Sequence, residues 1–259
     1  MTILGQHFLI NKNKIKKIVD ALGLKSGDAV IEIGPGHGEL TLELRIRNAE
    51  LRIIAIEKDK KLADNLKDKF KKDKDIEIIE GDALKILPEL TVSRKRQIKN
   101  YKIVGNIPYY ITGYLLRIIG ELKNKPSLII LTIQKEVAER AAAKPPKMNL
   151  LAASVQIWAK MEIIGHIPRK DFQPMPEVDS AIIKLTPKTK TLTLTPKPYY
   201  SFIKILFKQP RKTILNNLRR TTNNLQLLTK KLELIGINPN NRPQNLSIER
   251  IIKLAQILK

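Results

Sequence analysis

Short apolar runs alternate along the first two-thirds of the chain with longer segments whose apolar positions recur at helical spacing. Near the N-terminus, one helical face is formed by Ile15, Ile18, Val19 and Leu22. Seven runs rich in Ile, Val and Leu follow and predict strands at 29–33, 52–57, 76–80, 101–105, 127–134, 161–167 and 180–185. Helices are expected to begin near Gly38, Asp59, Ile111 and Lys135. Strands separated by helices predict a mainly parallel sheet covered on both faces.

The pattern changes after Leu185. Residues 187–198 contain three prolines and little that could be buried, which predicts a linker. Helical stripes then return, and Ser247 is suited to cap the last helix. We therefore expect a Rossmann-like α/β domain at 1–186, a linker at 187–198 and a small all-helical domain at 199–259.

Basic residues are in large excess and are concentrated towards the C-terminus. The chain has 48 Lys and Arg against 25 Asp and Glu, a formal net charge of +23. Residues 187–259 contain fifteen Lys and Arg and two Glu, which gives +13 for this segment alone. A field of this sign attracts nucleic acid, although part of the excess can reflect composition on solvated faces. The concentration favours a helical domain that docks on RNA or DNA.

Other classes of function are disfavoured by what the sequence lacks. It contains no cysteine and three histidines, so disulfides, thiolate chemistry and Cys/His zinc clusters are excluded and no metal site is expected. The first residues lack the basic and apolar regions of a signal peptide. No apolar run approaches the roughly 18 residues of a membrane span. We expect a cytoplasmic protein that does not bind a membrane.

A glycine-rich loop points to a nucleoside-bearing cofactor. Gly34, Gly36 and Gly38 lie between a predicted strand and a predicted helix, where glycine lets the backbone turn sharply near a ligand. Nineteen residues past Gly38, Glu57 ends the second strand and is placed to accept hydrogen bonds from ribose hydroxyls. A tight turn is the alternative for the loop alone. The spacing G-x-G-x-G differs from the dinucleotide fingerprint G-x-G-x-x-G, which disfavours a NAD-dependent enzyme.

The third strand is followed by Gly81, Asp82 and Ala83. An aspartate at the end of this strand can accept a hydrogen bond from the amino group of a bound adenine. A lone aspartate here could equally be a turn residue.

The tetrapeptide Asn106-Ile107-Pro108-Tyr109 follows the fourth strand and predicts a specific chemistry. The exocyclic amine of adenine is a poor nucleophile because its lone pair is delocalised into the ring. The Asn106 side-chain oxygen and the Ile107 carbonyl can hold the amine hydrogens and favour a pyramidal nitrogen, which attacks a sulfonium methyl in line. Tyr109 offers a ring on which an extruded base stacks. The alternative is a simple proline-bearing turn.

These motifs and several others resemble the small-subunit ribosomal RNA adenine dimethyltransferases of the kasugamycin-resistance type. The resemblance extends along essentially the full length and rests on GQHFL (5–9), EIGPGHGELT (32–41), AIEKD (55–59), GDAL (81–84), NIPYYIT (106–112), QKEVAER (134–140), FQPMPEVDSA (172–181), PRKTILNNL (210–218) and NRPQNLS (241–247).

The resemblance implies S-adenosylmethionine as cofactor. His7 and Leu9 would line its site, together with Gly34, Gly36, Glu57, Asp82, Ala83 and Asn106. Catalysis would involve Asn106, Ile107, Pro108 and Tyr109. Phe172 either packs in the core or sandwiches the target adenine against Tyr109. His37 is given no role, and His166, in an apolar strand, is expected to lie in the core.

The resemblance also implies a substrate: two adjacent adenosines in a hairpin loop near the 3′ end of the small-subunit RNA, methylated to N6,N6-dimethyladenosine in an immature 30S subunit by a monomer. The alternatives are a large-subunit methyltransferase that confers antibiotic resistance and a non-catalytic ribosome-assembly or RNA-binding factor. In the basic tail, contacts with RNA are expected from Lys204, Lys208, Arg211, Lys212, Arg219 and Arg220.

Overall fold

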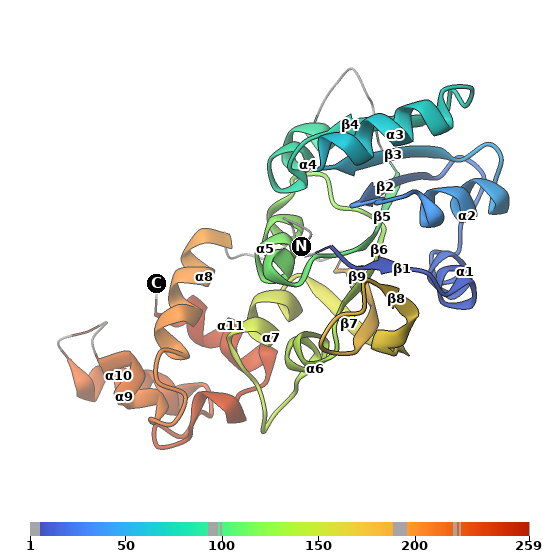
Figure 1. The fold of residues 1–259 in the computed structure, drawn as a ribbon. Helices are drawn as coiled ribbons and strands as arrows, with labels where there is room; N and C mark the ends of the chain where they lie inside the picture. Colours follow the sequence, from blue (N-terminus) through green and yellow to red (C-terminus); the bar gives the residue numbers. More distant parts are fainter. Residues whose placement is uncertain are drawn as a thin grey trace. The chain divides into compact units, whose positions relative to one another are not determined.

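The fold was analysed in a computed structural model that describes residues 6–92, 98, 100–188, 196–219, 222 and 224–258 (Figure 1). It divides into two compact units. The first consists of Met1–Ala138 and Met161–Pro187, and the second of Glu139–Lys160 and Lys188–Lys259. The second unit therefore contains a segment, Glu139–Lys160, that the sequence pattern assigned to the α/β domain.

A seven-stranded sheet with the order β4-β3-β2-β5-β6-β9-β7 organises the first unit (Figure 1). Its strands are β2 (Ala29–Ile33), β3 (Arg52–Glu57), β4 (Ile76–Glu80), β5 (Tyr101–Asn106), β6 (Leu128–Gln134), β7 (Ala159–Ile167) and β9 (Ser180–Pro187). The first five run parallel, with pairings such as Ile31 opposite Ile54 and Ile103, and β9 is antiparallel to β6. The prediction of a mainly parallel α/β sheet is confirmed.

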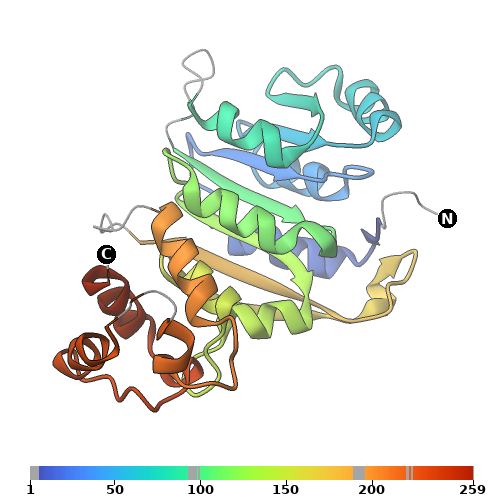
Figure 2. The same cartoon turned by 90° about the vertical axis from the view of Figure 1, so that its left-hand side faces the viewer.

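Helices cover both faces of this sheet because the strand order reverses its direction between β2 and β5. Right-handed crossovers place the helices after β2 and β3 on one face and those after β4 and β5 on the other. Figure 2 shows α4 and α5 in front of the sheet and α1 behind it. The helices of this unit are α1 (Lys12–Ala21), α2 (Glu39–Arg47), α3 (Lys60–Phe70), α4 (Ala83–Val92), η1 (Tyr109–Ile111), α5 (Thr112–Glu121) and η2 (Arg169–Asp171).

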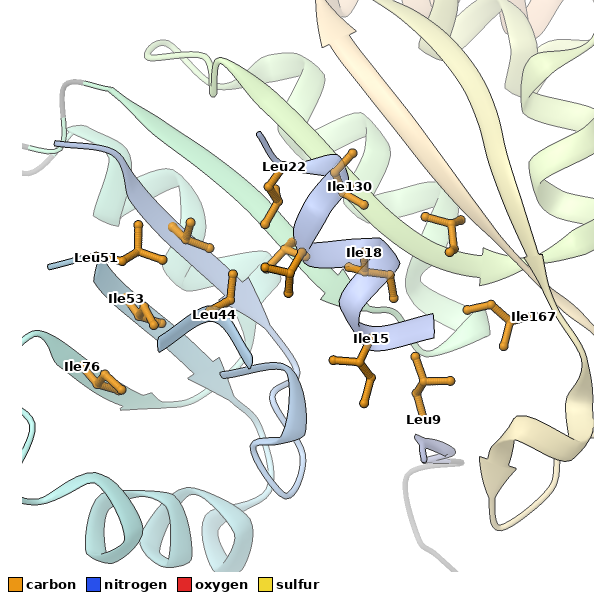
Figure 3. Packing of buried hydrophobic residues seen from close by; sticks show 14 of the residues in the cluster. Leu9, Ile15, Ile18, Leu22, Leu44, Leu51, Ile53, Ile76, Ile130 and Ile167 are labelled. Atoms are coloured by element: carbon orange, nitrogen blue, oxygen red, sulfur yellow. The ribbon is translucent and has the colours of Figure 1, made fainter. Parts of the chain in front are cut away.

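A cluster of branched aliphatic side chains fixes α1 and α2 to one face of the sheet (Figure 3). Ile15 and Ile18 of α1, and Leu22 directly after it, are at most 5% exposed, as the helical spacing in the sequence predicts. They pack with Leu44 of α2 and with strand residues that include Ile130. Burial of each such side chain stabilises the fold by about 1.5–3 kcal/mol.

The N-terminal segment joins the first unit through a second, two-stranded sheet. β1 (Phe8–Leu9) pairs antiparallel with β8 (Phe172–Gln173), so Leu9 lies opposite Phe172. The amide N–H of Ile10 extends the pairing by donating to the carbonyl of Asp171 over 2.9 Å. This sheet joins segments more than 160 residues apart, and no periodic pattern in the sequence predicts it.

The second unit consists mainly of helices. They are α7 (Leu150–Gln156), α8 (Pro196–Leu206), α9 (Ile214–Leu218), α10 (Leu225–Leu234), η4 (Pro243–Asn245) and α11 (Ile248–Ile257), and α6 (Lys135–Ala142) crosses the boundary between the units. The Tyr199 hydroxyl of α8 donates to the carbonyl of Ala153 in α7 over 3.1 Å, and the Tyr200 hydroxyl donates to the carbonyl of Ser154 over 3.5 Å. These bonds explain why α7, which precedes the last strands in sequence, belongs with the C-terminal helices.

The predictions for the linker and for His166 differ from the structure, and the prediction for Ser247 is confirmed. The predicted linker contributes its first residue to β9 and its last three to α8, and residues 189–195 lie outside the described part. His166 is exposed rather than buried, since β7 is an edge strand whose alternate side chains point to solvent. The Ser247 hydroxyl caps α11 as predicted. Among the described helices, none is long and apolar enough to span a membrane.

Candidate active site

A cleft of about 840 Å³, including its mouth open to solvent, lies in the first unit where four adjacent parallel strands end. It lies at the point where the strand order reverses, the usual ligand position in open α/β sheets. Its walls come from the N-terminal segment, the turns after β2, β3, β4 and β5, and β8. The lining residues are Gln6, His7, Phe8, Ile33, Gly34, Ile56, Glu57, Lys58, Gly81, Asp82, Ala83, Asn106, Ile107, Pro108, Tyr109, Tyr110, Ile111 and Phe172.

The glycine turn and Glu57 form one hydrogen-bonded arrangement. Glu57 is 3% exposed, and its carboxylate accepts the N–H of Gly36 at 3.1 Å and that of Asp59 at 2.9 Å. Burial raises the pKa of this carboxyl, although the backbone donors oppose the shift. Gly34 adopts a φ of +68°, which side-chain-bearing residues rarely adopt. The carboxylate is thus held at the cleft wall by backbone N–H groups.

Asp82 faces the same cleft and is paired with Lys58, a residue that sequence reasoning did not single out. The Lys58 ammonium lies 3.1 Å from one carboxylate oxygen of Asp82, and the other oxygen accepts the N–H of Leu84 in α4 at 3.0 Å. Burial alone would raise the pKa of Asp82, but these two hydrogen bonds hold it below its ordinary value. The bond to Asp82 in turn raises the pKa of Lys58.

Asn106, the last residue of β5, is anchored through its amide nitrogen. Nδ2 donates to the backbone carbonyl of His7 at 2.7 Å. Within the described residues, no donor reaches Asn106 Oδ1 or the Ile107 carbonyl oxygen, while the Ile107 N–H donates to the carbonyl of Thr132 at 3.0 Å. Two hydrogen-bond acceptors on consecutive residues of the cleft wall are therefore left for a ligand that donates two hydrogens.

Tyr109 is held from both ends. Its hydroxyl lies 3.0 Å from Oγ of Ser180, a fully buried residue at the start of β9, and burial raises the pKa of the phenol. Its ring faces the ring of His7, with 6.1 Å between the centroids and 28° between the planes. Sequence reasoning missed Ser180, although it lies within the segment 172–181 that carried the resemblance.

The two-stranded sheet brings His7 and Phe172 to the cleft. Besides its carbonyl bond to Asn106, His7 places Nδ1 2.8 Å from the carbonyl oxygen of Pro174. Phe172 is 3% exposed and lines the cleft, so it combines the core packing and the site position that the sequence left as alternatives. His37, exposed, packs its ring 4.2 Å from that of Phe8.

Most of the predicted site residues are brought together, and two are placed differently. Leu9 is buried in the hydrophobic cluster and lines a smaller neighbouring pocket with Glu32. Gly36 lies behind the cleft wall, where its N–H holds Glu57 and a Cβ would come within 2.7 Å of the Phe8 ring. Pro108 and Ala83 line the cleft as expected.

Glu32 lies at the floor of the glycine turn. Its carboxyl is 1% exposed, and one oxygen accepts the Thr41 hydroxyl at 2.7 Å, while the other has no donor among the described residues. Burial raises the pKa of Glu32 to about 7. Since this pKa lies near neutral pH, the carboxyl is about half protonated there and carries less negative charge than an ordinary glutamate.

In the second unit, a loop between α8 and α9 presents exposed cations. Buried Asn217 binds this loop, because its side chain accepts the Gln209 N–H at 2.9 Å and donates to the carbonyls of Gln209, at 3.0 Å, and Thr213, at 3.0 Å. Lys204, Lys208, Arg211, Lys212 and Arg219 are exposed in or beside it, and Arg220 lies outside the described residues. None of these five forms an ion pair with another described residue.

The strand order, the glycine turn after β2 and the Asn-Ile-Pro-Tyr turn after β5 together define a Rossmann-like methyltransferase. A family model described as ribosomal RNA adenine dimethylase matches residues 2–259. The chain belongs to this family, so the predicted family, and with it the predicted transfer of methyl groups to adenine in ribosomal RNA, is confirmed.

Curated relatives match along nearly the whole chain. The ribosomal RNA small subunit methyltransferase A of Dehalococcoides mccartyi (strain CBDB1) is 39% identical, over 97% of this chain and 86% of its own. The protein of the same name from Chlorobium chlorochromatii is also 39% identical, over 99% and 92%. A solved dimethyladenosine transferase from Plasmodium falciparum superposes with a TM-score of 0.80 at 27% identity, covering 95% of each chain. The 23S rRNA methyltransferase ErmE shares the fold, with a TM-score of 0.73 at 24% identity over 97% and 99%.

Proposed function

We propose that this chain transfers methyl groups from S-adenosylmethionine to N6 of two adjacent adenosines in a hairpin loop near the 3′ end of small-subunit ribosomal RNA, giving N6,N6-dimethyladenosine. The observation that carries the proposal is the end of β5, where Asn106 is anchored through Nδ2 and where Asn106 and Ile107, both lining the cleft, each keep an acceptor that no described donor reaches. The names of the curated relatives support the small-subunit substrate.

The cleft residues fit S-adenosylmethionine. The buried Glu57 carboxylate can accept hydrogen bonds from ribose hydroxyls, and Asp82, kept ionised by the Leu84 N–H and by Lys58, can accept from an adenine amino group. Gly34 lets the backbone turn beside these groups, and a Cβ there would lie 3.7 Å from the Asn106 carbonyl. When bound, S-adenosylmethionine supplies a methyl group activated by its sulfonium centre.

The chain's own contribution to the transfer is geometric and electrostatic. Asn106 Oδ1 and the Ile107 carbonyl would accept the two hydrogens of the target amine in the first transfer, and one of them the single remaining hydrogen in the second, and so localise the lone pair. Each transfer would form an N–CH3 bond as the S–CH3 bond of the cofactor breaks, and the nitrogen would release one proton to solvent. Because Nδ2 is fixed on His7, the amide does not have to reorient during the reaction, which is the condition for preorganised catalysis. The Tyr109 ring, held by Ser180, supports the extruded base from one side, and Phe172, which also lines the cleft, can contact its other side.

The basic loop of the second unit supplies affinity for RNA. Phosphate contacts position a protein on RNA without reading its sequence, so the cations around Asn217 can dock while the cleft selects adenine. The partner is the immature 30S subunit, bound by a monomer in the cytoplasm, where ribosomal subunits assemble.

The proposal is tested by incubating the protein with S-adenosylmethionine that carries a tritiated methyl group. Small and large ribosomal subunits from cells lacking the modification are supplied separately. Label is expected in the RNA of the small subunit alone, and its appearance in large-subunit RNA would contradict the proposed substrate.

A further inference from the structure

Exposed aromatic side chains are confined to one place in this molecule. The chain has one Trp, six Tyr and five Phe, and all twelve lie among the described residues. Ten are buried or half-buried, whereas Tyr110 is 64% exposed and Tyr114 is 59% exposed. Tyr110 lines the cleft and directly follows Tyr109 in the chain, and Tyr114 comes four residues later. Exposing two large rings to water is unfavourable, and adjacent exposed apolar side chains of this kind mark a surface for binding a ligand.

The two tyrosines are four residues apart at one junction of the backbone. Tyr110 belongs to η1, which continues directly into α5, and Tyr114 lies in the first turn of α5. Gly113, between them, is exposed, and a Cβ there would meet nothing within 4 Å, so no side chain obstructs this surface. Neither hydroxyl forms a hydrogen bond, and neither ring packs on another ring, within the described part of the chain.

Two lysines lie on the Tyr110 side of this surface. Lys58, which pairs with Asp82, keeps its side chain 50% exposed and is near enough to interact electrostatically with Tyr110. Exposed Lys85, in the first turn of α4, has no carboxylate within ion-pair distance among the described residues and is near enough to help lower the pKa of Asp82. Exposed aromatic rings next to cations are the combination that binds single-stranded nucleic acid: bases stack on the rings and phosphates pair with the cations. A protein partner would not require cations at this position.

We infer that Tyr110 and Tyr114 form a stacking platform for the RNA bases that flank the target adenosine. This inference rests on the proposed function. With the target adenine against Tyr109, the strand leaves the cleft over Tyr110 and continues along α5 over Tyr114. The platform holds neighbouring bases unstacked from the RNA, which helps present two adjacent adenosines to one cleft.

The test compares Tyr110→Ala and Tyr114→Ala with Tyr110→Phe and Tyr114→Phe. The probe is a hairpin RNA of the target sequence with 2-aminopurine next to the target adenosine. Each Ala variant should lose about fivefold or more in affinity, because stacking contributes about 1–3 kcal/mol per base, and each Phe variant should recover most of it. At saturating protein, wild type should quench 2-aminopurine and Tyr110→Ala should not.

Three controls make the outcome decisive. Ile46→Ala, which removes a 68% exposed apolar side chain from α2 outside the cleft, should leave RNA affinity unchanged. Replacing the flanking base by an abasic nucleotide should weaken binding by the wild-type protein. On this abasic RNA, Tyr110→Ala should cause no further loss of affinity, as expected if the Tyr110 ring and the flanking base interact directly. The melting temperatures of all variants should agree with that of the wild type.

Unchanged hairpin affinity in both Ala variants would overturn the platform. A loss of affinity for intact subunits without a loss for the hairpin would also overturn it, because that result would indicate a ribosomal protein as the partner. Weaker binding of S-adenosylmethionine alone by Tyr110→Ala would overturn it as well. Failure of the proposed function can be distinguished from failure of the platform. If the proposed function is wrong, the wild-type protein does not label small-subunit RNA. The quenching assay reports separately whether the rings stack on bases.

Discussion

The Asn106 side-chain amide donates a 2.7 Å hydrogen bond to the backbone carbonyl of His7, a residue 99 positions earlier in the chain. This bond joins the end of β5 to the N-terminal segment. Strand β1 of that segment pairs in turn with β8. It also orients the amide, since the nitrogen is engaged and the oxygen is left to accept. The N-terminal segment therefore positions the group proposed to act on the target amine.

Asn106→Ala is expected to lower the rate of methyl transfer about 10²–10³-fold, the usual effect of removing one preplaced polar group from an active site. Cofactor affinity should change far less, because Glu57 and Asp82 remain. Single-turnover rates and calorimetric titration with S-adenosylmethionine measure the two effects separately. Turnover near the wild-type rate would remove Asn106 from the mechanism.

Tyr109→Ala should be impaired far more than Tyr109→Phe, since stacking on the target base requires a ring. The Tyr109 hydroxyl positions the ring through its hydrogen bond with Ser180. Ser180→Ala should therefore lower activity about as much as Tyr109→Phe. Combining these two changes should then cost no more than either alone in kcat/KM. Equal impairment of the Phe and Ala variants would show that stacking is the wrong explanation.

Glu57→Ala should sharply weaken binding of S-adenosylmethionine and leave RNA affinity unchanged. Because burial raises the pKa of Glu57, wild-type cofactor affinity should also fall as the pH is lowered through that raised pKa and the carboxyl takes up a proton. Glu57→Gln should bind weakly at every pH and lose this dependence. Calorimetric titrations between pH 5 and pH 8, taken as a rough range around neutrality, provide the measurement. If the affinity of the wild-type protein for S-adenosylmethionine does not change with pH across this range, an ionised Glu57 does not bind the ribose hydroxyls.

Glu32 makes the stability of the fold depend on pH in the opposite sense to a paired carboxylate. Its pKa is about 7 in the folded protein against an ordinary value of 4.5, so between these values the folded state retains a proton that the unfolded state loses. Stability should therefore fall as the pH rises from about 4.5 to 7, by about 3 kcal/mol relative to Glu32→Gln. Urea unfolding of both proteins over this range measures the difference. Parallel curves for the two proteins would refute the assignment.

Replacing Lys208, Arg211 and Lys212 by Gln should weaken binding to small subunits and flatten its salt dependence. Each lost phosphate contact is expected to reduce the slope of log affinity against log salt by about 0.7–0.9. Lys71, Lys72 and Lys74, exposed in the turn after α3, offer a control with the same change in net charge. Equal effects of the two triple substitutions would indicate a general effect of charge rather than docking.

Local patterns predicted the strands well because burial imposes them residue by residue. β2, β3 and β4 begin and end where their apolar runs do, and the Gly34 and Asn106 turns follow directly from strand ends. Parallel topology then brings the ends of separate strands to one edge of the sheet. Glu57, Asp82, Asn106 and their neighbours could therefore be placed in one site from the sequence alone.

What could not be predicted depends on contacts between distant segments. The bonds of His7 to Asn106 and Pro174, and of Tyr109 to Ser180, join residues 71 to 167 positions apart and leave no periodic signal. The Lys58–Asp82 pair likewise requires two strand ends to be adjacent. Residues 139–160 were assigned by their order in the chain, whereas hydrogen bonds such as Tyr199 to Ala153 connect them to the C-terminal helices.

The central claim is that this cleft dimethylates two adjacent adenosines of small-subunit RNA. Its most direct test is mass-spectrometric mapping of unmodified small subunits after reaction with S-adenosylmethionine and either wild type or Asn106→Ala. The account predicts N6,N6-dimethyladenosine at two consecutive positions in the 3′-terminal hairpin loop with wild type, and neither with the variant. Modification at a single adenosine, at another site, or equally by both proteins would contradict it.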